Sequence, residues 1–158
     1  MNSETSMKAD TPESGVDRKA WMSLVASADV KVLQDLWQGY GRNPEHTWLR
    51  TPEAGGVMVR GRMGASGAPF NLGEMTVTRC ALTLADGTVG HGYVQGRSKA
   101  QAEIAAKVDA LMQTDASDDV QRQILTPLQT AKQAKKTKRA AKAAATKVDF
   151  FTMVRGED

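Results

Sequence analysis

Three arginines beside a glycine-rich segment are the side chains in this sequence best suited to bind a charged ligand. Arg60 and Arg62 alternate along one strand-like run, and Arg79 lies in a second run of the same kind. A guanidinium group can hold phosphate oxygens through two parallel hydrogen bonds, so these residues are candidate phosphate contacts. An equally good interpretation is that they are solvated, paired with Glu74 or bound to a partner chain.

The glycine-rich segment itself, GRMGASGAPF at residues 61–70, invites comparison with a phosphate-binding loop. It lacks the Lys-Ser/Thr ending of such a loop, and no helical pattern follows it, so we interpret it as a flexible connection. Asn71 and Glu74 come next and could orient a hydroxyl or a partner group. A lone carboxylate without a matched partner is poor evidence for acid–base chemistry, and we assign no catalytic residue.

Metal binding is not predicted, because His46 and His91 have no ligand-type spacing with Cys80. Cys80 is the single cysteine, so it cannot form an internal disulfide, which fits a reducing compartment. No apolar run approaches the ~18 residues that a membrane span requires. The N-terminal residues lack the apolar stretch of a signal peptide. We therefore expect a cytoplasmic protein.

Four runs with the alternation of β-strands predict an antiparallel meander of about four strands that carries these side chains. Pro52 is expected to end the first strand, because proline cannot donate a ladder hydrogen bond. The predicted strands comprise residues 46–51, 57–63, 75–84 and 88–95.

The Asp86-Gly87 pair predicts a two-residue type I′ turn between the last two strands. Such a turn would oppose Leu82 to His91 and make His91 a structural histidine on the face of Leu82. The other face would carry small residues and admit a helix of this chain or a partner: Ala81, Thr83, Gly90 and Gly92.

Two short helices are predicted before the sheet, with Asp17 and Asp29 as their N-caps. Gly41 follows the second helix, where glycine accepts the left-handed conformation that ends a helix. The two helices are expected to form a hairpin with Trp21 and Trp37 as its core anchors.

After the sheet, Ser98 is expected to cap a helix that runs to about Met112, and a longer helix is predicted over residues 120–145. Pro127 should start or kink a segment of the long helix. A cationic face on this helix creates an electrostatic footprint, yet it lacks interleaved aromatics, so an acidic protein partner or solvated lysines explain it better than nucleic acid. The face comprises Lys132, Lys135, Lys136, Arg139 and Lys142.

The chain has 158 residues with 41% hydrophobic content, which suits one domain with a modest core. We expect a disordered tail over residues 1–16, a single α+β domain over residues 17–147 and a C-terminal arm over residues 148–158. The arm either closes the chain's own core or, as we favour, reaches a neighbouring subunit. Its candidate partner contacts are Phe150, Phe151, Met153 and Arg155.

Several stretches resemble the PhnG subunit of bacterial carbon–phosphorus lyase, and the resemblance covers about residues 17–158. They are MVRGRMG at residues 58–64, GAPFNLGEMTVTRC at 67–80, LADGTVGHGYVQGR at 84–97, VDFFTMVRGED at 148–158, RKAWMSLV at 18–25 and ALMQ at 110–113.

The resemblance implies a subunit of a core complex that contains PhnG, PhnH, PhnI and PhnJ, each present twice, assisted by the ATP-binding-cassette-like PhnL. It implies exchange of the adenine of MgATP for a phosphonate such as methylphosphonate, which gives α-D-ribose 1-methylphosphonate 5-triphosphate. In the family the glycosidic cleavage is placed on PhnI, so the resemblance implies a structural or activating chain that binds no cofactor, with MgATP as a substrate of the complex. The alternatives are a stand-alone phosphate-binding module that uses Arg60, Arg62 and Arg79, and a nucleic-acid-binding protein that uses the basic helix.

Overall fold

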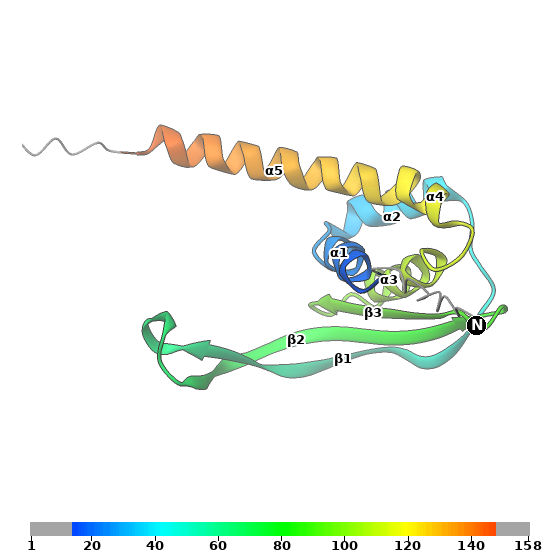
Figure 1. The fold of residues 1–158 in the computed structure, drawn as a ribbon, viewed down its shortest axis with the longest axis horizontal. Helices are drawn as coiled ribbons and strands as arrows, with labels where there is room; N and C mark the ends of the chain where they lie inside the picture. The colour runs from blue at the N-terminus through cyan, green and yellow to red at the C-terminus, as the bar shows by residue number, and fades with distance from the viewer. Residues whose placement is uncertain (1–13, 148–158) are drawn as a thin grey trace, which may run out of the picture.

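The computed structural model describes residues 14–147, so the predicted C-terminal arm and most of the predicted N-terminal tail lie outside the described residues. One antiparallel sheet forms a layer, and the helices cover one of its faces (Figure 1). The α+β class predicted from the sequence is confirmed. In chain order the elements are α1 (Ser14–Ala26), α2 (Val30–Tyr40), β1 (His46–Arg62), η1 (Met63–Ala65), β2 (Pro69–Leu84), β3 (Val89–Gln95), α3 (Lys99–Leu111), α4 (Ser117–Val120), η2 (Gln121–Leu125) and α5 (Thr126–Ala145).

The sheet has three strands in the order β1-β2-β3, so the expectation of four strands is wrong. β1 continues through Pro52 instead of ending there. Pro52 is tolerated because β1 is an edge strand, and the register of its pairing with β2 shifts on both sides of Arg50. The two short strands predicted for this region are therefore one long strand.

The turn between β2 and β3 is longer than the predicted two residues. The side chain of Asp86 accepts a hydrogen bond from the Thr88 amide at 2.8 Å, and the Leu84 amide donates to the Thr88 carbonyl at 2.9 Å. The resulting register pairs Ala81 with His91, one residue away from the predicted pairing. A one-residue slip moves a side chain to the other face, and His91 is accordingly exposed, so the prediction that it shares the face of Leu82 is wrong.

Helix α3 packs directly on the glycines of β3. A Cβ atom at Gly90 would lie 2.0 Å from the Ala106 carbonyl oxygen, and one at Gly92 would lie 2.0 Å from the Ala102 carbonyl oxygen. The predicted close approach to a small-residue face is therefore confirmed, and a helix of this chain makes it. Ala81 and Thr83, which were predicted to share that face, pair with His91 and Val89 on the other one.

Local capping signals position most of the helices. Asp29 accepts hydrogen bonds from the amides of Lys31 and Val32, and Gly41 ends α2 with a φ of 67°. The Ser98 side chain accepts from the Gln101 amide at the start of α3. Helix α1, however, begins at Ser14, so the predicted N-cap position for Asp17 is wrong.

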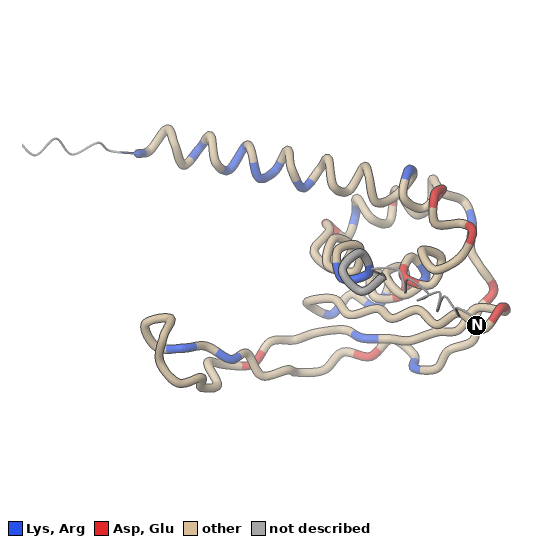
Figure 2. The backbone as a smooth tube through the Cα atoms, viewed as in Figure 1, with Lys and Arg blue, Asp and Glu red and all other residues tan. Residues whose placement is uncertain are grey.

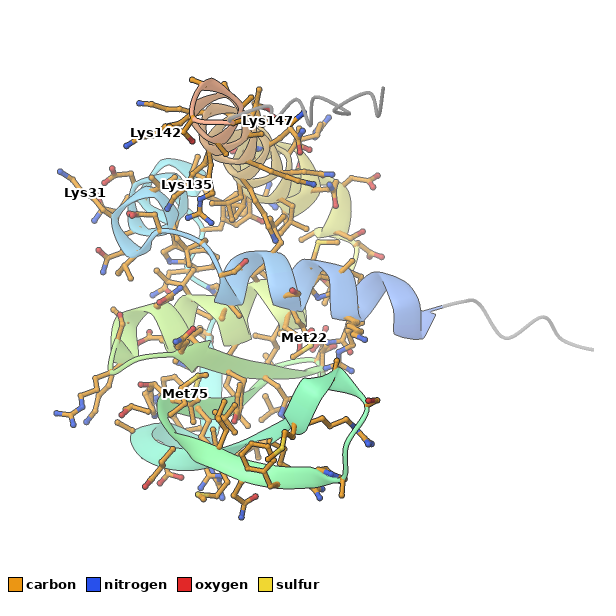
Figure 3. The ribbon with its side chains drawn as sticks, turned by 90° about the vertical axis from the view of Figure 1, so that its left-hand side faces the viewer. Met22, Lys31, Met75, Lys135, Lys142 and Lys147 are labelled. Atoms are coloured by element: carbon orange, nitrogen blue, oxygen red, sulfur yellow. The ribbon has the colours of Figure 1, made fainter. Side chains whose placement is uncertain are left out.

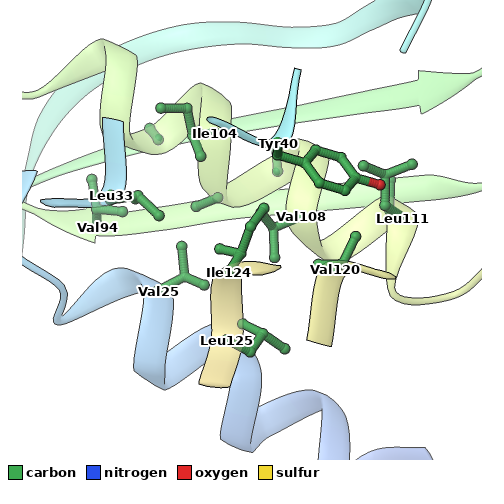
Figure 4. Packing of buried hydrophobic residues seen from close by; sticks show 14 of the residues in the cluster. Val25, Leu33, Tyr40, Val94, Ile104, Val108, Leu111, Val120, Ile124 and Leu125 are labelled. Atoms are coloured by element: carbon green, nitrogen blue, oxygen red, sulfur yellow. The ribbon is translucent and has the colours of Figure 1, made fainter. Parts of the chain in front are cut away.

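The core lies between the sheet and the helices, where α1 and α2 both pack against α3 (Figure 4). Its fully buried side chains include Leu33, Val94, Val108 and Ile124. Ile124 belongs to η2, a π-helical turn directly before Pro127 in the first turn of α5. Proline thus starts α5 as predicted. Within residues 14–147 no helix combines the length and the apolar character that membrane crossing demands.

Candidate interaction surfaces

A two-stranded ribbon extends well past β3 and the helices α1 and α3, on the same side of the molecule as the projecting end of α5 (Figure 1). Strand β3 pairs with β2 only from Val77 to Thr83, so residues 56–62 of β1 and residues 69–76 of β2 continue without a third strand. We call these two segments the distal ribbon. Eight residues of strand span about 26 Å, and a two-stranded ribbon of this kind is marginally stable alone in water.

The distal ribbon has one polar and one apolar face, as its cross-strand pairs show. The polar face carries the pairs Met58–Glu74, Arg60–Asn71 and Arg62–Pro69. The apolar face carries Val57, Val59, Met75 and Phe70, and Leu72 lies against Gly61 on this side. Phe70 is 44% exposed and Leu72 is 67% exposed, so nothing among the described residues covers this face.

The predicted ligand-contacting residues fall at two separate places. Arg60, Arg62, Asn71 and Glu74 come together on the polar face of the distal ribbon, where Arg62 donates a hydrogen bond to the Gly67 carbonyl at 2.9 Å. Arg79 lies eight residues along β2 from Asn71, which corresponds to about 26 Å. A single phosphate group therefore cannot touch all three arginines of one chain in this arrangement.

Arg79 is engaged in an exposed ion-pair network at the other end of the sheet. Its Nε lies 3.2 Å from Oε1 of Glu53, and the same oxygen lies 3.4 Å from a guanidinium nitrogen of Arg50. Glu53 and not Glu74 is thus its acidic partner. All three side chains are about half exposed, so this network contributes little to stability.

Helix α5 is the second projecting element, on the opposite side of the helical layer from the sheet (Figures 1 and 3). From Gln129 to its end every residue is exposed. Lys132 Nζ donates to Oγ of Ser27 at 3.3 Å, and alanine, lysine and glutamine are strong helix formers, which explains how the exposed part of the helix persists. Its side chains include six cations and no acid (Figure 2): Lys132, Lys135, Lys136, Lys138, Arg139 and Lys142.

A buried carboxylate that the sequence analysis did not single out joins three elements of the body. Asp109 of α3 is 1% exposed and accepts hydrogen bonds from Arg18 Nε at 3.0 Å, a second Arg18 nitrogen at 2.7 Å, Trp21 Nε1 at 3.1 Å and the His91 amide at 2.9 Å. The hydrogen bond to Asp109 raises the pKa of Arg18. Four donors occupy the carboxylate, so its role is structural.

Lys107 of α3 is a second buried charge that the sequence analysis missed. Its Nζ donates to Oδ1 of Asn43 at 2.8 Å and to Oε1 of Glu103 at 2.6 Å. Both Lys107 and Asp109 lie among alanines in the sequence, and only the period of α3 could have suggested that charges there face neighbouring elements.

The described residues offer little chemistry of their own. Burial raises the pKa of the Cys80 thiol to about 11, so it is protonated and unreactive near neutral pH. Across residues 14–147 there is no group of three His, Cys, Asp or Glu side chains that could hold a metal ion. The prominent features of the described residues are instead two exposed surfaces, the amphipathic distal ribbon and the cationic helix α5.

A compact α+β body with two long uncovered elements is the form expected of a chain that is embedded in an assembly. Residues 16–156 match the family model described as "Phosphonate metabolism protein PhnG". The chain is also 44% identical over 141 residues to the alpha-D-ribose 1-methylphosphonate 5-triphosphate synthase subunit PhnG of Rhizobium meliloti (strain 1021), covering 89% of this chain and 90% of the relative. The chain belongs to the PhnG family.

Proposed function

We propose that this chain is a structural or activating subunit of a complex that displaces adenine from MgATP with a phosphonate such as methylphosphonate. The product would be α-D-ribose 1-methylphosphonate 5-triphosphate, and the setting would be phosphonate catabolism in the cytoplasm. The observation that carries the proposal is the 44% identity to a named subunit of that synthase along nearly the whole of both chains.

The distribution of surface supports an assembly role for the chain. The apolar face of the distal ribbon leaves Phe70 44% and Leu72 67% exposed. Burying one such side chain stabilises by roughly 1.5–3 kcal/mol, so a partner that covers this face gains several kcal/mol. In the body, by contrast, the apolar core is packed between the sheet and the helices, and the buried charges Asp109 and Lys107 are paired within one chain.

The proposed partners are the PhnI, PhnH and PhnJ counterparts, two copies of each with two copies of this chain, assisted by the PhnL counterpart. The C-terminal arm, with Phe150, Phe151, Met153 and Arg155, is proposed to contact a neighbouring subunit, although it lies outside the described residues. Helix α5 is proposed to dock on an acidic protein surface, because its six cations have no acidic neighbour within the helix.

Co-expression tests the proposal. We expect the chain to purify as a defined complex with its PhnI and PhnH counterparts, and to associate with itself or precipitate when expressed alone. A monodisperse, stable monomer without affinity for either counterpart would overturn the assembly role. The stand-alone alternative predicts the opposite result, a stable monomer that binds ATP.

Arginine variants separate an interface role from contact with substrate. If Arg60, Arg62 and Arg79 support structure or interfaces, each change to alanine should lower assembly and adenine release together. Arg79→Ala with an intact complex and no adenine release would instead assign Arg79 a direct substrate role. Arg50→Ala is the matched control, because it removes the other arginine of the same Glu53 network.

A further inference from the structure

One edge of the distal ribbon has the form of a docking site for a strand. Strand β2 is paired with β1 on one side, whereas on the other side β3 ends at Gln95 opposite Val77 and the last contact runs from the Gly96 amide to the Thr76 carbonyl at 2.9 Å. On the side away from β1, the backbone of residues 70–75 therefore has no strand beside it among the described residues. An unpaired row of backbone donors and acceptors is a template for another strand.

We propose that the C-terminal segment of a second copy of this chain, residues 148–158, adds to this edge as a third strand of the distal ribbon. The inference rests on the proposed function in taking the chain to work inside an assembly with more than one copy. It deepens that function by naming the partner of the C-terminal arm.

The length and composition of the segment fit the open edge. Residues 150–155 number six, as many as residues 70–75 of the open edge. With the period-2 geometry of a strand, Phe150, Thr152 and Val154 would share one face, and Phe151, Met153 and Arg155 the other. A parallel strand with Arg155 beside Glu74 would bring Phe151 beside Phe70 and Val154 beside Gly73, and cross-strand apolar pairs are the unit of sheet stabilisation.

Charge sets the direction and register of the added strand. Glu74 has no ion-pair partner among the described residues, and a parallel alignment that places Arg155 beside it supplies one. In the same alignment Glu157 falls beside Thr76 and the terminal Asp158 beside Val77, where β3 ends and the exposed Arg97 follows Gly96. The antiparallel alignment with Arg155 beside Glu74 would instead place residues 148–152 against the part of β2 that β3 already occupies, whereas the parallel alignment places only Asp158 there.

The reach of the segment points to a second copy and not to the same chain. Helix α5 ends at Ala145 on the far side of the helical layer from the sheet, and Figure 3 shows Lys142 and Met75 at opposite sides of the body. The layers from α5 through α1 and α3 to the sheet are about 10 Å apart, about 30 Å in all. Eleven extended residues span about 36 Å, so crossing within one chain would leave only about two residues to lie along the ribbon.

Disulfide trapping between two tagged copies tests the inference. One full-length copy carries Gly73→Cys and the other Val154→Cys, and both are co-expressed with the PhnI and PhnH counterparts. A Cβ at Gly73 meets no atom within 4 Å, so the cysteine is accommodated, and the buried native Cys80 does not compete. Gly55→Cys is the matched control, because it is equally open but lies on β1, away from the free edge.

We expect mild oxidation to give a covalent dimer that bears both tags, is reversed by reductant and is absent with Gly55→Cys. A disulfide can form only when the two Cα atoms lie within about 7 Å. The inference is overturned if the Val154→Cys thiol is trapped on another subunit, if a chain with both cysteines closes on itself, or if the complex forms without any trapped dimer. If the wild-type chain does not assemble with its counterparts, the proposed function fails. Disulfide trapping between copies of the purified chain alone then still tests whether the C-terminal segment of one copy adds to the ribbon of the other.

Discussion

Replacing Asp109 with alanine should lower the free energy of unfolding by about 3–5 kcal/mol. The carboxylate is 1% exposed and accepts from Arg18, Trp21 and the backbone of His91, which belong to α1 and to β3. Its removal leaves the indole and the amide without an acceptor, at roughly 1–3 kcal/mol each. Arg18 also loses its carboxylate partner, but its side chain is 34% exposed and can be rehydrated, so the total stays close to the roughly 3–5 kcal/mol typical of removing one partner of a buried ion pair.

Urea denaturation followed by circular dichroism measures this loss, at one fixed protein concentration because self-association changes apparent stability. Asp115→Ala is the matched control, since this exposed aspartate near the end of α3 should change stability by less than about 0.5 kcal/mol. Asp109→Asn should fall between the two, because it keeps the volume but points an amide donor at existing donors. A loss below about 1 kcal/mol for Asp109→Ala would refute the view that this carboxylate holds the three elements together.

Three further predictions follow from the packing and the surface. Gly92→Val should cost about 3 kcal/mol or more, because its Cβ would lie 2.0 Å from the Ala102 carbonyl, whereas Gly73→Val should leave the melting temperature within about 2 °C. Burial raises the pKa of the Cys80 thiol from 9.0 to about 11, so at pH 8 its reaction with a thiol reagent should be about 100-fold slower than in urea; equal rates would contradict this. Deleting residues 148–158 should abolish assembly and leave circular dichroism and the melting temperature unchanged; a truncated chain that unfolds, or one that assembles normally, would show that the arm has another role.

The sequence predicted the local structure correctly where a single side chain determines the backbone conformation. The capping roles of Asp29 and Ser98 follow from a single side-chain oxygen beside free amides, and the structure shows both. The small residues of β3 likewise indicated a close approach, which α3 makes at Gly90 and Gly92.

The strand count and the hairpin register depended on context that the sequence does not display. Pro52 ends a central strand but is accommodated in an edge strand, and nothing local shows that β1 is an edge. Asp86-Gly87 favours a two-residue turn, yet the side chain of Asp86 bonds to the Thr88 amide and lengthens it. That one residue was enough to move His91 to the exposed face.

The sequence indicated only in part how the five candidate contact residues are arranged in space. Four of them share one face of the distal ribbon, because cross-strand pairing brings Arg60 to Asn71. Arg79 lies far along β2, a separation that becomes visible only once the strand is known to be continuous. The contact between Arg18 and Asp109 joins residues 91 positions apart, and no local pattern signals it.

Adenine release measured with and without this chain tests the central claim most directly. MgATP and methylphosphonate are incubated with the PhnH, PhnI and PhnL counterparts, and free adenine is quantified by chromatography. We predict release only when this chain is present, and none from this chain alone. Equal release in its absence would contradict the proposed role, and release by the chain alone would show that it is itself the catalyst.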